Sequence, residues 1–133
     1  MSGQIEGIAE IVLWVRDMDV ALNFYKELLG LEVISRPEMP NTFLKAAEGE
    51  LGVPDMIVLV PHPEGLAFPR EKQSRVLHHI ALRVHRDAYE GLRARFEKEG
   101  IEVRSGVHPV LKGVRTFYVD DPDGNEVEFI SPE

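Results

Sequence analysis

The feature that most constrains this chain is an internal repeat. Three segments recur in the same order at an offset of 69 or 70 residues: Glu10–Val15 over His79–Val84, Gly30–Val33 over Gly100–Val103, and Ile57–Val60 over Val127–Ile130. Each match is short, but three in one order at nearly one offset indicate a duplicated module. A repeat of this length that occurs twice does not have the pattern of a solenoid array.

Each copy has the pattern of one strand, one helix and three further strands. The expected strands lie at 8–15, 31–36, 42–47 and 56–60, and again at 76–84, 101–104, 113–119 and 126–130. Apolar residues at helical spacing predict one helix that begins after Asp17 or Asp19 and a second at about residues 87–99. A glycine follows each of them, Gly30 and Gly100, as a C-terminal stop.

The expected fold class is therefore α+β, with two tandem βαβββ modules in a single domain that spans residues 1–133. Module 1 covers about residues 5–62, a proline-rich linker about 61–75, and module 2 about 76–131. The segment Asp120–Asn125 combines proline, glycine and asparagine and predicts a β-turn rather than a calcium-binding loop.

Alternation along the strands places candidate site residues on one face of each predicted sheet. Apolar positions such as Leu13 and Phe129 form one face, which we expect to pack on the helices. The opposite, mixed faces carry four repeat-related positions: Glu10, Val58, His79 and Glu128. If the modules join through a pseudo-two-fold axis, these positions approach one another. A carboxylate in a half-closed cleft needs a partner, and a divalent cation is a suitable one.

Three motifs resemble the vicinal-oxygen-chelate superfamily of glyoxalases, bleomycin-resistance proteins and extradiol dioxygenases. They are FYKELLGL at 24–31, HHIAL at 78–82 and DPDGNEVEF at 121–129. The resemblance implies a glyoxalase-like cleft of curved mixed sheets with the helices on the outside. Its metal-ligand positions fall on Glu10, His79 and Glu128, with Val58 in the fourth place.

The sequence departs from the family pattern at two of these positions. Dioxygenase-like members usually have histidine where Glu10 stands, and glyoxalase-like members usually have an acidic or amide side chain where Val58 stands. One histidine with two carboxylates is a hard ligand set, which favours Mg²⁺ or Mn²⁺ over Fe²⁺.

The resemblance implies a divalent-metal-dependent enzyme of the lyase, isomerase or dioxygenase type that chelates vicinal oxygens of a small organic substrate. The cation is Mn²⁺, Mg²⁺, Fe²⁺, Ni²⁺ or Zn²⁺. Glu128 is the candidate base, and Tyr118, on the mixed face, is the candidate proton donor. The alternative is a metal-free binding or sequestering protein of the bleomycin-resistance type, in which Trp14 contributes to a ligand groove in a dimer. The roles of Val58 and His62 stay open.

Charge and composition exclude several partners. The net charge is −8, and no basic face of the kind that binds nucleic acid is evident. No apolar run approaches the roughly 18–20 residues that span a bilayer. The chain has no cysteine, so it forms no disulfide framework. We expect a cytoplasmic homodimer that binds a small molecule and neither nucleic acid nor membrane.

Overall fold

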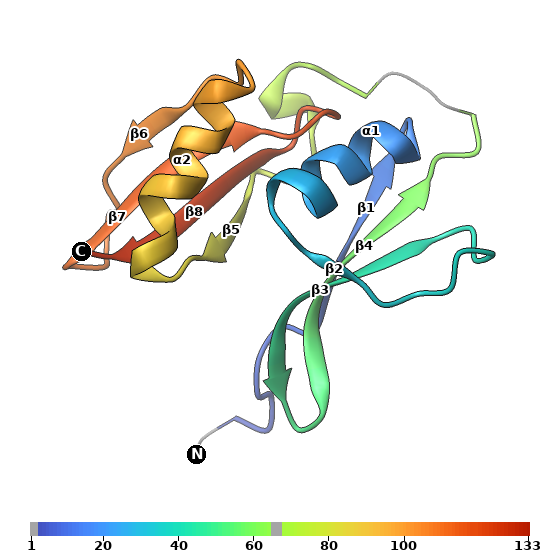
Figure 1. Cartoon of the computed structure of the whole chain (residues 1–133), viewed down its shortest axis with the longest axis horizontal. Helices are drawn as coiled ribbons and strands as arrows, with labels where there is room; N and C mark the ends of the chain where they lie inside the picture. The colour runs from blue at the N-terminus through green and yellow to red at the C-terminus, as the bar shows by residue number, and fades with distance from the viewer. Residues whose placement is uncertain (1–2, 65–67) are drawn as a thin grey trace. The chain divides into compact units, whose positions relative to one another are not determined.

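Two units with the same order of elements make up the structure, a computed structural model that describes residues 3–64 and 68–133 (Figure 1). The units are Met1–Ala67 and Phe68–Glu133, and each is described by itself. Within the described residues, no helix has the length and apolar character needed to cross a membrane.

Unit 1 consists of a four-stranded mixed sheet and one helical segment. Its elements are β1 (Glu10–Val15), α1 (Met18–Leu22), a π-helical continuation (Asn23–Leu28), β2 (Glu32–Val33), β3 (Thr42–Glu50) and β4 (Val53–Pro61). The strand order is β1-β4-β3-β2, with β1 parallel to β4 and the other pairs antiparallel.

Unit 2 repeats this topology. Its elements are a 3₁₀ turn (Lys72–Ser74), β5 (Ile80–Arg83), a 3₁₀ turn (Arg86–Ala88), α2 (Tyr89–Lys98), β6 (Arg104–Gly106), β7 (Val114–Asp120) and β8 (Glu126–Pro132). The strand order is β5-β8-β7-β6, again with one parallel pair, β5 and β8. The expected α+β fold of two βαβββ modules is confirmed.

The two sheets also share their register. In unit 1 the pair Phe43 and Val58 joins β3 to β4. In unit 2 the equivalent pair is Tyr118 and Glu128, which joins β7 to β8. The repeat found in the sequence is therefore a repeat of strand pairing as well.

The helix ends explain why two strands start later than expected. Asp17 is the N-cap of α1, and its carboxylate accepts hydrogen bonds from the Asp19 and Val20 amides. After each helix a backbone amide closes the C-terminal cap: Leu31 donates to Tyr25, and Ile101 donates to Phe96. Because these amides belong to the caps, Leu31 and Ile101 lie outside the strands. The strands expected at 31–36 and 101–104 are observed at Glu32–Val33 and Arg104–Gly106.

The strand expected at 76–84 is also shorter, since β5 begins at Ile80. Ile80 pairs with Val127, and β8 itself begins only one residue earlier, at Glu126. Residues before His79 therefore have no strand beside them in this ladder. His78 and His79 therefore lie directly before the N-terminal end of β5 and outside the strand.

Alternation of faces is as predicted. In β1, Leu13 and Val15 are buried, whereas Val12 and Trp14 are more than half exposed. In unit 2, α2 covers one face of the sheet (Figure 1), and its Phe96 ring packs against Phe117 and Phe129. The mixed face of β7 and β8 is thus the face away from this core.

The predicted turn before β8 is confirmed. The Gly124 amide donates to the Asp121 carbonyl, and the Asp121 carboxylate accepts from the Asp123 and Asn125 amides. Gly124 has a φ of +86°, which favours glycine.

Candidate functional site

The mixed face of the second sheet brings two predicted site residues together. Glu128 lies on β8 and is 3% exposed. His79 lies directly before β5, and its Nε2 atom is 3.1 Å from Glu128 Oε1. Burial of a carboxylate is unfavourable without a partner, so this contact is a specific arrangement rather than a surface pair.

Each member of the His79–Glu128 pair makes a further hydrogen bond on the side away from the other. The buried Thr116 hydroxyl donates to Glu128 Oε2 at 2.6 Å. On the other side, His79 Nδ1 is 2.8 Å from His78 Nδ1, so one of these nitrogens carries the hydrogen and the other accepts it. The four residues form a continuous chain from Thr116 to His78.

This donor set fits a divalent cation. Two ligands at right angles, each about 2.0–2.2 Å from a metal, lie roughly 3 Å apart, which matches the spacing of His79 Nε2 and Glu128 Oε1. A histidine that binds metal through one nitrogen usually donates a hydrogen bond from the other, and His78 offers an acceptor for it. The Thr116 hydroxyl orients Glu128 in a similar way, because it donates a hydrogen bond to the second carboxylate oxygen.

Tyr118 borders the same pair. It is paired in register with Glu128, so the two side chains share a face, and its ring centroid is 6.1 Å from that of His79. Burial raises the pKa of the Tyr118 hydroxyl, and its hydrogen bond with Glu128 raises it further. The hydroxyl therefore stays protonated at neutral pH and is able to donate.

The other predicted positions lie in unit 1. Glu10 is an exposed residue on β1, paired with Met56. Val58 is 2% exposed and packs as a core residue of β4. The His62 ring is 4.9 Å from the exposed Trp14 ring, and its Nδ1 accepts from the Glu64 amide. The part of Glu10 in a shared site stays a prediction.

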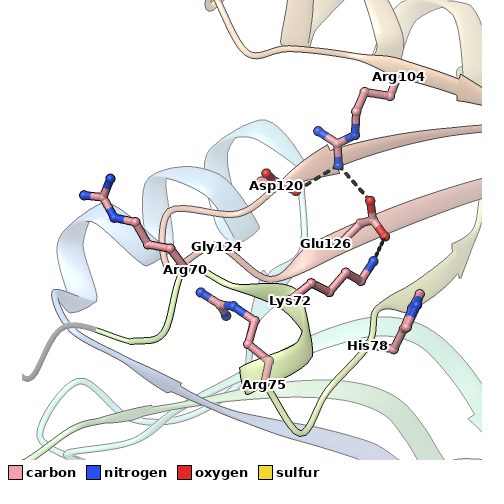
Figure 2. Close-up of a pocket in the computed structure, with 8 residues that line it drawn as sticks. All are labelled: Arg70, Lys72, Arg75, His78, Arg104, Asp120, Gly124 and Glu126. Atoms are coloured by element: carbon pink, nitrogen blue, oxygen red, sulfur yellow. Dashed lines mark hydrogen bonds and ion pairs between the residues drawn. The ribbon is translucent and has the colours of Figure 1, made fainter.

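A second group of possible ligands overlaps the first. Ligand atoms of His78, His79 and Glu126 all lie within 4.8 Å of one another. Both oxygens of Glu126 are already engaged, however: Oε1 pairs with Lys72, and Oε2 pairs with Arg104 at 2.9 Å (Figure 2). A cation bound by Glu126 would have to displace one of these positive groups, so Glu128 is the better ligand.

The Lys72–Glu126–Arg104 network should make the free energy of unfolding depend on pH in the acidic range. Burial alone would raise the pKa of Glu126, but the hydrogen bonds from Lys72 and Arg104 outweigh it and lower the pKa below its ordinary value of 4.5. A lowered pKa contributes stability above the ordinary value, and that stability is lost as the pH falls through the folded-state pKa. Glu126→Gln should thus destabilise the protein at neutral pH, and this loss should shrink as the pH falls through the lowered folded-state pKa of Glu126.

Urea unfolding of the unchanged protein and of Glu126→Gln, from neutral to acidic pH, measures the difference in their free energies of unfolding. Glu38→Gln is the control, because Glu38 is an exposed glutamate in a surface pair with Arg36. A Glu126→Gln effect that is the same at acidic and neutral pH would contradict the assignment.

Two residues of the site were not identified from the sequence. His78 is an exposed residue to which the sequence assigns no role, but its Nδ1 lies 2.8 Å from His79 Nδ1. Thr116 is two residues before Tyr118 on β7, and strand alternation therefore places it on the same face. That spacing was the available signal for Thr116, whereas a contact between adjacent histidine rings has no sequence signal.

Comparison with known proteins gives consistent matches along the chain. The family model described as the Glyoxalase/Bleomycin resistance protein/Dioxygenase superfamily matches residues 7–129. A lactoylglutathione lyase from Neisseria meningitidis serogroup A is 31% identical over 122 residues, which cover 90% of this chain and 86% of that protein. A catechol-2,3-dioxygenase from Bacillus subtilis is 25% identical over 87% of this chain, which spans only 38% of that relative's length.

A solved structure has a similar fold. The glyoxalase/dioxygenase from Nostoc punctiforme has a TM-score of 0.78 and 20% sequence identity, with 100% of this chain and 95% of that chain covered.

Proposed function

The chain belongs to the glyoxalase/bleomycin resistance protein/dioxygenase superfamily, and from that premise we propose that it is a divalent-metal-dependent enzyme for a small organic substrate with two neighbouring oxygens. The observation that carries this proposal is the contact between the half-buried His79 and the buried Glu128. Relatives named as a lyase and a dioxygenase support an enzymatic role. The reaction type is lyase, isomerase or dioxygenase.

The proposed ligands are His79 and Glu128 from unit 2 and Glu10 from unit 1. A bound divalent cation supplies Lewis-acid stabilisation of negative charge that develops on a substrate oxygen. The two carboxylates favour Mg²⁺ or Mn²⁺. Thr116 and His78 orient Glu128 and His79 through the hydrogen bonds on their far sides.

Glu128 and Tyr118 are the proposed proton-transfer groups. In the alternative without metal on its carboxylate, Glu128 accepts a proton from the substrate, since it lies in the site with limited access to water. A tyrosine hydroxyl is protonated at neutral pH, and burial of Tyr118 raises its pKa further, so its hydroxyl donates a hydrogen bond to a substrate oxygen that becomes negative.

A second candidate function is metal-free binding of an organic ligand. It is favoured by Trp14 and Val12, apolar residues on the mixed face of β1 that are 54% and 52% exposed. Under this proposal, Trp14 and His62 form part of a ligand groove in a homodimer. A dimer in the cytoplasm is proposed for either function.

Metal titration tests the first proposal against the second. Untagged protein is dialysed against a chelator and then titrated with Mn²⁺, Mg²⁺, Fe²⁺, Ni²⁺ or Zn²⁺. We expect binding of one ion per site and, at about 100 times the Kd, stabilisation by about 2.7 kcal/mol in thermal melts. Protein kept in chelator is the control. If none of these ions binds near stoichiometrically, the metal-dependent function is wrong and the metal-free one is preferred.

A further inference from the structure

A cavity of about 220 Å³ lies in unit 2, and one of its lining residues, His78, contacts His79 of the His79–Glu128 pair. Figure 2 shows the residues that line it: Arg70, Lys72, Arg75, His78, Arg104, Asp120, Gly124 and Glu126. Four of them are permanently cationic and two are carboxylates. This positive excess is unusual in a chain with a net charge of −8.

Three of the cations come from the segment before β5. Arg70, Lys72 and Arg75 lie in or beside the short 3₁₀ turn Lys72–Ser74. Lys72 pairs with Glu126, so it binds this segment to the start of β8. The segment expected to be part of a linker therefore forms one wall of the cavity.

Two of the cations are not neutralised by the contacts that they make. Arg75 donates to Asn125 Oδ1 at 3.3 Å and to the Asp123 carbonyl at 2.8 Å, and both acceptors are uncharged. Arg70 is exposed, and no ion pair joins it to the residues that the structure describes. In contrast, Lys72 and Arg104 are paired with carboxylates.

Gly124 leaves space for the Arg75 side chain in the wall of the cavity. A Cβ atom at Gly124 would collide with Arg75 Nη2, so the absence of a side chain leaves the space that this guanidinium occupies. The turn Asp121–Asn125 then fixes the guanidinium through its two hydrogen bonds. Arg75 is thus a preorganised donor at the cavity, rather than a flexible surface residue.

We propose that this cavity binds a phosphate group. A phosphate monoester carries a charge of about −1.5 to −2 at neutral pH, which balances a surplus of two cations. The planar fork of a guanidinium matches the spacing of phosphate oxygens. The ligand is either inorganic phosphate or the phosphate end of a small ester.

The position of the cavity favours an ester. His78 lines the cavity, and its Nδ1 is 2.8 Å from His79 Nδ1. A phosphate bound here is separated by the His78 ring from the pair that we assign to metal binding, so the cavity anchors one end of a substrate whose neighbouring oxygens reach His79 and Glu128. This substrate role rests on the proposed function, whereas phosphate binding itself does not.

Calorimetric titration of chelator-treated protein with inorganic phosphate and with glycerol 3-phosphate tests the proposal. Chloride at matched ionic strength is the reference. We expect saturable binding of phosphate that Arg70→Gln and Arg75→Gln each weaken about tenfold. Arg36→Gln removes the same charge from an exposed side chain of unit 1 and should leave the affinity unchanged. Arg75→Lys, which keeps the charge, should recover part of it.

The ester distinguishes the two sources of phosphate. Binding of glycerol 3-phosphate that is tighter than that of phosphate, and tightened further by Mn²⁺, identifies an ester; equal affinities identify inorganic phosphate. The proposal is overturned if neither anion binds saturably, or if Arg36→Gln weakens binding as much as Arg70→Gln does. Because Arg70 makes no ion pair with described residues, its variant tests the cavity even if Arg75→Gln does not fold. Titrations without metal keep this result separate from that of the metal proposal.

Discussion

Glu128→Gln should abolish divalent-metal binding, whereas Glu126→Gln should leave it intact. The two glutamates are on the same strand face, but their environments differ. Glu128 faces His79 at 3.1 Å and is otherwise held by the neutral hydroxyls of Thr116 and Tyr118. Glu126 is neutralised by Lys72 and Arg104. Removal of a residue that hydrogen-bonds a metal ligand weakens metal affinity about 10–100-fold. We therefore expect the loss of the ligand Glu128 itself to lower the affinity at least about 100-fold.

Competition with a fluorescent metal indicator measures both affinities. Glutamine keeps the size of the side chain and an oxygen that accepts from Thr116, so Glu128→Gln should fold. Melting temperatures in chelator provide that control, and His79→Ala should match Glu128→Gln in its loss of metal. The opposite result, with metal lost in Glu126→Gln and retained in Glu128→Gln, would assign the site to His78, His79 and Glu126.

Phe117→Ala should lower the free energy of unfolding by about 3–5 kcal/mol. Phe117 is fully buried in the centre of β7, and its ring centroid is 5.1 Å from that of Tyr89 and 5.0 Å from that of Phe129. Its removal leaves a cavity between α2 and the sheet, and it also removes the edge-to-face contact with Tyr89.

Urea denaturation measures this loss. Phe43→Ala is the matched control, since Phe43 is a half-buried phenylalanine in the sheet of unit 1. It should cost clearly less, because part of its ring is already exposed to water. Equal losses in the two variants would show that the aromatic cluster of unit 2 is not the main source of its stability.

The sequence was sufficient for the fold because its strands have only two faces. Once Leu13 or Phe129 is assigned to the core, alternation fixes the side of every neighbour. The same rule placed Glu128 and Tyr118 on one face. It could not fix the limits of the strands, because alternation does not show which amides are used by helix caps, such as that of Ile101, which donates to Phe96.

Contacts made by irregular segments could not be predicted from the sequence. His79 is one residue outside β5, and its orientation depends on its contact with His78. Arg75 and Lys72 lie in a segment without periodicity, so nothing in the sequence indicates that they bind the turn before β8 and its first residue. The role of Glu10, the module limits, the homodimer and the cytoplasmic location stay predictions.

The shared register has a consequence for how such a chain can evolve. Phe43 and Val58 in unit 1 occupy the places of Tyr118 and Glu128 in unit 2, and Val58 and Glu128 are both buried. One duplicate thus carries hydrocarbon where the other carries reactive oxygens, at equivalent positions of the same antiparallel strand pairing. Valine and glutamate codons can differ by a single nucleotide. A single substitution can therefore remove a ligand from this frame, whereas a ligand gained at Val58 also requires polar partners for the buried carboxylate.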